Sequence, residues 1–242
     1  AENIFAETHI PRERQDAFAL ESQRRAIAAI NAGRFRDEIA PVPIPQRKGD
    51  PLWIDTDGHP QMKRGDDGYT VSTSAEKLAA LKPVARPDGV HTAGSSSQIA
   101  DGASAVLLMS AEKAAELGVT PLARVLQSTL VGCDPVLMLE GPIPATRKVL
   151  ERQGLTVDDI DVFEINEAFA SVVLAWAKEL APDMAKVNPN GGAIALGHPL
   201  GGTGCFLTTK AVHELQRTGG RYAVITMCCG GGLGTGTLIE RI

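Results

Sequence analysis

The chain has 242 residues, of which 43% are hydrophobic and 22% are charged, and its formal net charge at pH 7 is −5. This composition is typical of a globular protein of one or two domains. The negative charge and the few aromatic residues argue against nucleic acid as a partner, because the phosphate backbone is repelled and few rings can stack on bases. No apolar run approaches the roughly 20 residues of a membrane span, and no export signal opens the chain, so we expect a soluble, cytoplasmic protein without membrane contact.

The first predicted element is a helix over residues 11–32. Pro11 suits a first helical position, apolar residues recur at helical spacing, and Gly33 supplies a stop. Proline and glycine then punctuate residues 41–75, which predicts loops with a hairpin around Asp57-Gly58. The chain begins without Met in what reads as the approach to a helix, which indicates a truncation or a cleavage site.

From residue 100 onwards, strand and helix patterns alternate. The expected strands are 103–109, 123–131, 162–165, 222–227 and 236–240, and the expected helices are 111–117 (ended by Gly118), 145–153, 168–180 and 202–217. Such alternation predicts an α/β fold with helices layered on a buried sheet, and ligands gather beyond the carboxyl ends of the strands in such folds. We place a domain boundary near 118–121.

His198 stands between Gly197 and Pro199, just before a glycine-rich segment that opens the helix toward Thr208. The positive end of that helix dipole disfavours a second positive charge, so a neutral imidazole is expected. A neutral ring can accept a hydrogen bond from a nucleophile or donate one to a thioester oxygen. The plainer alternative is a histidine that only caps its helix. The flanking glycines favour the functional interpretation, because they permit close approach of a ligand.

The four cysteines, at positions 133, 205, 228 and 229, form neither a CxxC metal pattern nor a disulfide framework, so reduced thiols and no metal site are expected. Cys228 follows an apolar strand and precedes three glycines, where backbone N–H groups are free to form an oxyanion hole. The alternative for Cys228 is a small buried thiol that fills space. Cys229 should face the opposite side by strand alternation, and we assign it that space-filling role.

Asn166 ends the strand 162–165 and precedes the next helix, where a capping role alone would explain it. An amide at this edge of the sheet could also hold a water against a carbonyl oxygen. The polar loop 91–98 could wrap an amide-bearing ligand arm, or it could be a plain turn. Nucleotide-loop interpretations of the glycine clusters fail, because 197–204 lacks a P-loop lysine and 230–236 lacks the G-x-G-x-x-G spacing.

Three motifs together resemble the thiolases, the acetyl-CoA acyltransferases and acetyltransferases: Asn-Glu-Ala-Phe at 166–169, Gly-Gly-Ala-Ile-Ala-Leu-Gly-His-Pro at 191–199, and Cys-Cys-Gly-Gly-Gly at 228–232. Residues 22–26 and 92–97, with Asp-Gly-Ala at 101–103, are similar to that family's loop-domain helix and pantetheine loop. The resemblance implies a thiolase-like layered α/β/α domain with part of a loop domain. The N-terminal half of the fold is expected to be absent.

By that resemblance His198 activates a nucleophilic thiol, Cys228 moves the proton at the carbon alpha to the thioester, and Asn166 holds an oxyanion-hole water. The backbone N–H of Gly230 serves a second oxyanion hole. In the coenzyme A site, Ser96 and Ser97 meet the pantetheine arm and Phe169 lines its tunnel. No cofactor is implied, because coenzyme A is itself a substrate. The implied reaction converts 3-ketoacyl-CoA and CoA to a shortened acyl-CoA and acetyl-CoA, or runs in reverse as a Claisen condensation.

The resemblance also implies a domain layout: part of a loop domain over 1–90, the last strand and helix of the N-terminal domain over 91–118, and the C-terminal domain over 119–242. Thiolases carry their acylated cysteine in an N-terminal half, on a segment that has no counterpart here, and none of the four cysteines fits that role. We therefore expect this chain alone to be inactive. Its expected partners are CoA and acyl-CoA, with a complementary N-terminal thiolase polypeptide or further copies in a homo-oligomer.

Two rival interpretations remain open from the sequence. Ketoacyl synthases share the α/β design and a similar histidine loop, but they use a second histidine where this chain has Asn166, and they lack a cysteine like Cys228. A non-catalytic subunit or scaffold is the other alternative, since a fold does not guarantee an activity.

Overall fold

The computed structural model describes residues 1–242 and is built around a four-stranded mixed sheet with the order β5-β8-β7-β6. Its strands are β5 (Ala123–Gly132), β6 (Val162–Ile165), β7 (Tyr222–Cys229) and β8 (Leu233–Arg241). β6 and β7 run parallel, and the other two pairs are antiparallel. The carboxyl ends of β6 and β7 therefore lie at the same edge of the sheet, and the predicted site residues Asn166 and Cys228 lie at that edge.

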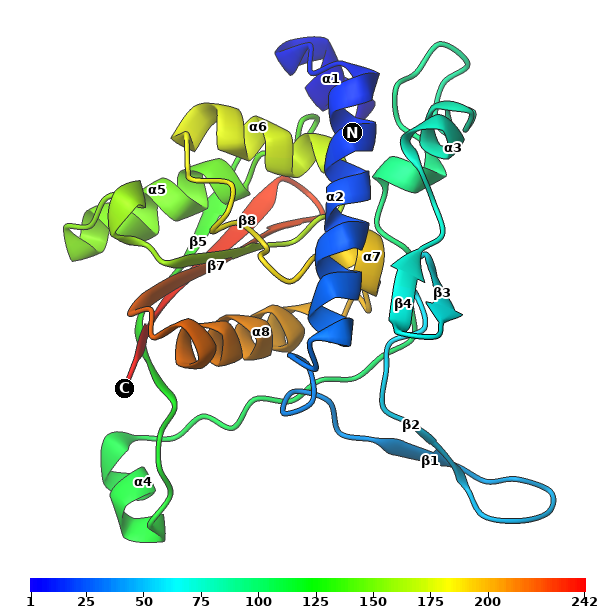
Figure 1. Cartoon of the computed structure of the whole chain (residues 1–242). Helices are drawn as coiled ribbons and strands as arrows, with labels where there is room; N and C mark the ends of the chain where they lie inside the picture. The colour runs from blue at the N-terminus through cyan, green and yellow to red at the C-terminus, as the bar shows by residue number, and fades with distance from the viewer.

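Helices cover both faces of this sheet (Figure 1). On one face lie α5 (Pro142–Gln153) and α6 (Ala170–Leu180), and on the other lies α8 (Thr203–Thr218). Successive strand residues supply the two cores: Phe163 and Val224 pack with α5 and α6, whereas Val162 and Ala223 pack with α8. This two-residue alternation explains why the strands read as continuous apolar runs, because both of their faces are buried.

The start of α5 lies against β8 with almost no side chain between the two backbones. A Cβ atom added to Gly141 would stand 2.6 Å from the carbonyl oxygen of Leu233, and one added to Gly234 would collide with the backbone of Gly141. Both positions therefore need glycine for steric reasons. The contact fixes the hairpin of β7 and β8, on which Cys228 is paired with Gly234.

The N-terminal third of the chain forms a second layer beside the central domain, where α2 (Arg12–Asn31) contacts α6 and the one-turn helix α7 (Ala193–Leu196). This layer contains α1 (Glu2–Thr8), α2, the short helix α3 (Ala75–Ala79) and the 3-10 turn η1 (Ala93–Ser95). The helix α2 matches the prediction for 11–32. Neither α1 nor α7 was predicted, and α7, with four residues, is too short to show a helical period.

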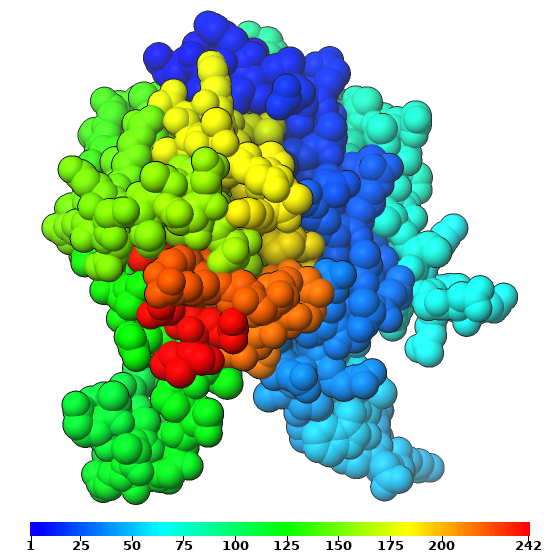
Figure 2. Space-filling view, turned by 60° about the vertical axis from the view of Figure 1, so that its left-hand side comes forward, coloured from blue at the N-terminus to red at the C-terminus, as the bar shows by residue number.

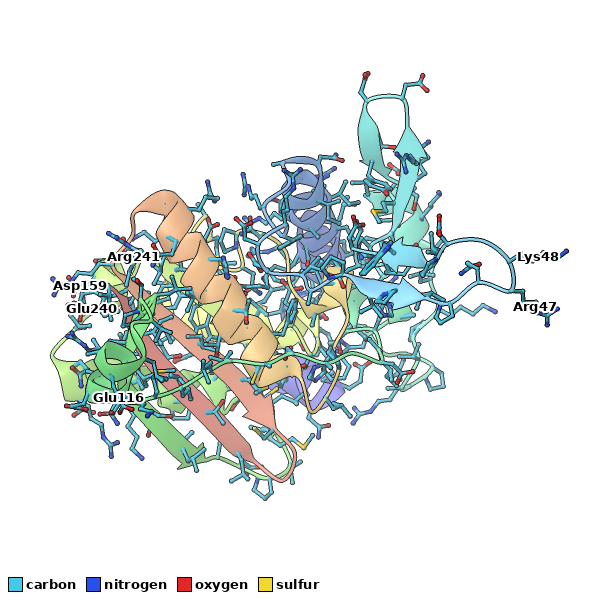
Figure 3. All side chains as sticks on the ribbon, turned by 90° about the horizontal axis from the view of Figure 1, so that it is seen from below. Arg47, Lys48, Glu116, Asp159, Glu240 and Arg241 are labelled. Carbon is cyan, nitrogen blue, oxygen red and sulfur yellow. The ribbon has the colours of Figure 1, made fainter.

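Two hairpins occupy residues 42–71, and neither turns at Asp57-Gly58 as predicted. The first pairs β1 (Val42–Ile44) with β2 (Leu52–Ile54), and the second pairs β3 (Met62–Gly65) with β4 (Gly68–Val71). The β1–β2 loop carries Arg47 and Lys48 at a tip that points away from the rest of the molecule (Figure 3). The prediction misplaced the turn because several Asp-Gly and proline signals compete within this stretch.

The predicted strand over 103–109 is not formed in the structure. These residues have no regular structure and lead to α4 (Ala111–Leu117), which stands away from the rest of the molecule (Figure 2). Apolar side chains along this segment are exposed, with Leu107 at 81% and Leu108 at 72%. An apolar run of this kind becomes a strand only when another strand supplies its hydrogen bonds, and none in this chain lies beside it.

The remaining predicted elements from residue 111 onwards are confirmed within a few residues at their ends. The helix α4 ends at Gly118 in the left-handed conformation, as expected, and β6 has the predicted bounds. A second 3-10 turn, η2 (Val157–Asp159), precedes β6. None of the helices has the length and apolar character needed to cross a membrane.

Candidate active site

His198 lies in the loop between α7 and α8, and its ring is held in one tautomer. Its Nδ1 atom lies 2.6 Å from the hydroxyl oxygen of Thr203, and that hydroxyl donates its single hydrogen to the carbonyl oxygen of Pro199 at 2.8 Å. The hydroxyl can therefore only accept from Nδ1, so Nδ1 carries the proton. The Nε2 atom is therefore unprotonated and can only accept, which is the form required of a general base.

The neutral state of His198 was expected from the dipole of α8, but burial is its main cause in the structure. Partial burial of the imidazole lowers the pKa of His198 below its ordinary value, because a charged ring loses solvation. The ring is five residues before the first residue of α8. The ring nevertheless lies beside the first turn of α8, because its Nδ1 atom is 2.6 Å from the hydroxyl of Thr203, so the positive end of the helix also disfavours the charged form.

Asn166 directly faces this histidine. Its Nδ2 atom lies 3.4 Å from Nε2 of His198, and its backbone N–H donates to the carbonyl oxygen of Thr226 at 3.0 Å. The capping alternative is excluded, because α6 begins four residues later with Phe169 as its N-cap. The Oδ1 atom of Asn166 is buried without a hydrogen-bond partner in the protein, and such an atom ordinarily needs one. It is available to accept from a water or a ligand.

Cys228 is two residues beyond Thr226 on β7, so strand pairing brings it to the same edge as Asn166. Its side chain packs on a cluster that also contains Phe169 and Val172. Burial raises the pKa of the Cys228 thiol to about 11, so the group keeps its proton at neutral pH. No hydrogen bond joins this thiol to His198 or Asn166; the structure links Cys228 to them through the sheet.

The three glycines after Cys229 form the turn into β8. Gly231 and Gly232 both have φ of +82°, which L side chains rarely adopt. Gly230 is exposed, and a Cβ atom added there would meet nothing within 4 Å. Its backbone is therefore open to an approaching ligand, as its predicted role requires, but the role itself stays a prediction.

The loop 92–99 is joined by its backbone to both sides of the candidate site. Ser96 forms a β-bridge with Phe169, and the N–H of Ser97 donates to the carbonyl oxygen of Ala168 at 3.0 Å. At the other end, the carbonyl oxygen of Gln98 accepts from the N–H of His198 at 2.9 Å. The structure thus brings the predicted coenzyme A residues next to the predicted catalytic residues, and their contact with a ligand arm stays a prediction.

Sequence patterns missed several side chains that support this arrangement. The buried carboxylate of Glu167 accepts hydrogen bonds from Ser22 at 2.7 Å, Asn188 at 2.9 Å and the N–H of Ile194 at 3.1 Å, so it ties α2 to the residues before His198. The sequence could have indicated this role, because Glu167 follows Asn166 in an apolar stretch and a buried carboxylate without a partner would be costly.

A second buried support is an ion pair. The Nζ atom of Lys210 lies 2.8 Å from Oε2 of Glu164, both side chains are fully buried, and the same ammonium donates to the carbonyl oxygen of Gly191. Burial raises the pKa of Glu164 to about 7, and Lys210 works against that rise. The pair connects α8, β6 and the turn before α7.

A family model described as "Thiolase, C-terminal domain" matches residues 119–241, and one described as "Thiolase, N-terminal domain" matches residues 1–112. An acetyl-CoA acetyltransferase of Chromobacterium violaceum is 52% identical over the whole chain, and a beta-ketoadipyl-CoA thiolase of Acinetobacter baylyi is 49% identical. The chain spans 59% of the length of each of these relatives.

Solved structures give the same result for the fold. The Bacillus anthracis acetyl-CoA acetyltransferase superposes with a TM-score of 0.91 at 44% identity, and human mitochondrial 3-ketoacyl-CoA thiolase does so with 0.88 at 40% identity. Each match covers the whole of this chain and 59% or 58% of the other. The expected α/β fold is thereby confirmed. The expected absence of the N-terminal half is not supported, since the N-terminal family model matches 1–112. The expected limits of the three domains stay predictions.

Proposed function

Because the chain belongs to the thiolase family, we propose that it serves in an acyl-CoA C-acyltransferase, which cleaves 3-ketoacyl-CoA with CoA or condenses acyl-CoA with acetyl-CoA. Its substrates would be thioesters of coenzyme A, and the family is an enzyme family. The single observation that carries the proposal is the His198 ring. Its Nδ1 proton is committed to Thr203, and its basic Nε2 faces the amide of Asn166.

In the proposed cleavage, Nε2 of His198 takes the proton of an attacking thiol, which activates it as a nucleophile. The thiolate attacks the keto carbon of 3-ketoacyl-CoA, and the bond to the alpha carbon breaks. The electron pair of that bond leaves as the enolate of acetyl-CoA. A second thiol, that of CoA, then takes the acyl group from the enzyme, and the first thiolate is the leaving group.

Cys228 would give its proton to the acetyl-CoA enolate, and in condensation it would remove the same proton. Its pKa of about 11 supports the first step, because a thiol that stays protonated at neutral pH is ready to act as an acid. The oxygen of the enolate or thioester needs donors nearby. Asn166, through a water, and the N–H of Gly230 are the groups that we propose for this purpose.

The pantetheine arm of the substrate would lie along Ser96 and Ser97, beside Phe169. All three residues are partly exposed, and they are next to each other through the Ser96–Phe169 bridge. The same loop then reaches His198, because Ile99, two residues after Ser97, forms a parallel β-bridge with His198. An arm held along this loop would therefore end near the reacting groups.

The thiol that becomes acylated is proposed to come from outside the described residues, so we expect no turnover by this chain alone. Cys228 is assigned to proton transfer, Cys133 lies in the loop between β5 and α5, and Cys205 lies in the first turn of α8; none of the described hydrogen bonds joins Cys133 or Cys205 to His198. The proposed partner is a complementary N-terminal thiolase polypeptide. The exposed apolar segment 99–109 supports this proposal, because Ile99 is 94% exposed next to the candidate site and a neighbouring chain would cover it.

The test is to mix the chain with the part of the Chromobacterium violaceum relative that this chain does not span, and to follow loss of acetoacetyl-CoA in the presence of CoA. We expect cleavage only from the mixture. His198→Ala should slow acylation of the nucleophile, whereas Cys228→Ala should leave acylation intact and abolish condensation, as followed by mass spectrometry. Cys205→Ser on α8 is the matched control and should act like the unsubstituted chain.

A properly formed complex that does not consume acetoacetyl-CoA would overturn the proposal and favour a non-catalytic scaffold. Loss of acylation in Cys228→Ala would show that the role given to Cys228 is wrong. Full activity of the chain alone would refute the need for an external thiol.

A further inference from the structure

A second histidine, His59, lies behind the candidate site, in the loop between β2 and β3. Its Nδ1 atom lies 3.2 Å from Oε1 of Gln98, and Nε2 of Gln98 donates to the carbonyl oxygen of His59, also at 3.2 Å. The Oε1 atom of Gln98 is an amide oxygen and can only accept, so Nδ1 of His59 donates to it. The two residues therefore form a reciprocal pair of hydrogen bonds that joins segments 39 positions apart in the chain.

Gln98 passes this constraint to His198 through its backbone. Its carbonyl oxygen accepts from the N–H of His198 at 2.9 Å, and the next residue, Ile99, bridges to His198 in parallel. The side chain of Gln98 is thus fixed by His59 while its main chain fixes His198. No other side chain forms a hydrogen bond with Gln98.

The ring of His59 also restricts the residue before His198. Gly197 has φ of +92°, and a Cβ atom added there would stand 3.0 Å from Cδ2 of His59 and 3.0 Å from Cβ of Ala100. The imidazole therefore lies against the glycine backbone where the chain turns toward His198. A glycine turn has wide conformational freedom, and a ring packed on it removes part of that freedom.

The segment that carries His59 is itself anchored to the core. Two residues on, the N–H of Gln61 donates to Oε1 of Gln23 at 2.7 Å, and the buried amide of Gln23 donates to the carbonyl oxygen of Ile194 in α7 at 3.2 Å. His59 is thus held from α2, and it can transmit the position of that helix to the loop. A freely moving surface histidine would have no such support.

We propose that His59 is a positioning residue that holds the backbone of His198 in place through Gln98 and Gly197. His59 touches no reacting group, and the value of its role for catalysis rests on the function proposed above. Its effect on the His198 backbone is independent of that function and can be measured on this chain without substrate.

The test is amide hydrogen exchange at His198, followed by NMR in the 242-residue chain, with His59→Phe and His59→Asn as a matched pair. His59→Phe keeps a ring against Gly197 but removes the donor to Gln98. His59→Asn places an amide N–H where Nδ1 stood. We expect exchange of the His198 amide to be about five to thirty times faster in His59→Phe, and accelerated less in His59→Asn, which keeps the donor to Gln98 but removes the ring from Gly197.

A residue that only stabilises its own loop would accelerate exchange at residues 55–61 and leave His198 unchanged, and that result would overturn the proposal. His213→Phe on α8 is the control, because the His213 ring forms no hydrogen bond in the structure. If His59→Phe does not fold, Gln98→Met tests the same link, since it keeps the backbone carbonyl and removes the side-chain amide. Unchanged exchange at His198 in that variant would equally refute the link, whereas failure of acetoacetyl-CoA cleavage would refute only the proposed function.

Discussion

The buried pair of Lys210 and Glu164 leads to a prediction about stability. Lys210→Met keeps a long apolar side chain in α8 but removes the only cation that contacts Glu164, and both side chains are fully buried. Removing one partner of a buried pair leaves an uncompensated charge and costs about 3–5 kcal/mol of unfolding free energy. That loss is a large part of the roughly 5–15 kcal/mol that holds a typical protein folded.

The loss should depend on pH in a defined direction. The folded-state pKa of Glu164 is about 7, above the ordinary value near 4.3, so the folded state binds more protons between these values and this group's contribution to stability falls as pH rises through them. Without Lys210 the pKa rises further, because the cation that lowers it is gone. The cost of Lys210→Met should therefore be greatest above about pH 7 and shrink toward about pH 5, where Glu164 is protonated.

Urea unfolding across this pH range measures the effect, with the double variant Lys210→Met and Glu164→Gln as the matched control. A neutral amide has no buried charge to compensate, so the double variant should recover most of the stability at high pH. A cost below about 1 kcal/mol for Lys210→Met, the range of an exposed pair, would refute the reasoning. So would a cost that is equal at both ends of the pH range.

Three further predictions concern the site itself. Thr203→Val removes the acceptor of the Nδ1 proton, so ¹⁵N shifts of His198 should show a larger share of the Nε2-protonated tautomer; unchanged shifts would contradict the assignment. At about pH 8, Cys228 should react with iodoacetamide about a hundredfold more slowly than a thiol with the reference pKa of 9.0, because the pKa of Cys228 is about 11. Peptide mapping measures the rate at Cys228, and a rate equal to or faster than that of the reference thiol would refute this prediction. Gly197→Ala should lower the unfolding free energy by about 1–3 kcal/mol, whereas Gly201→Ala, with nothing within 4 Å, should cost less than half as much; equal losses would be inconsistent with strain.

The elements around the sheet could be predicted because each strand has two buried faces and each long helix has one apolar stripe. Residues 162–165 form β6 with the predicted bounds, and the helix expected over 11–32 is α2. The strand expected over 103–109 fails for the opposite reason. Its apolar residues fit a strand, but a strand is defined by a neighbour that local sequence does not contain.

The candidate site was predictable only in part. Glycines and strand ends pointed to Asn166, His198 and Cys228, because such positions leave polar groups open to a ligand. The groups that hold them could not be found in this way. The side-chain partners of Glu167 are 21 and 145 positions away in the chain, and Gln98, the partner of His59, is 39 positions away. No short sequence pattern encodes contacts over such separations. Their roles become visible only when the backbone brings the partners together.

The contact between Gly141 and Gly234 has a consequence for anyone who later aligns many homologous chains. Both positions should tolerate no other amino acid, simply because two main chains touch there. Gly234 is also the cross-strand neighbour of Cys228. An invariant glycine at position 234 could therefore be mistaken for a catalytic requirement. The close contact between the start of α5 and the β7–β8 hairpin already accounts for it.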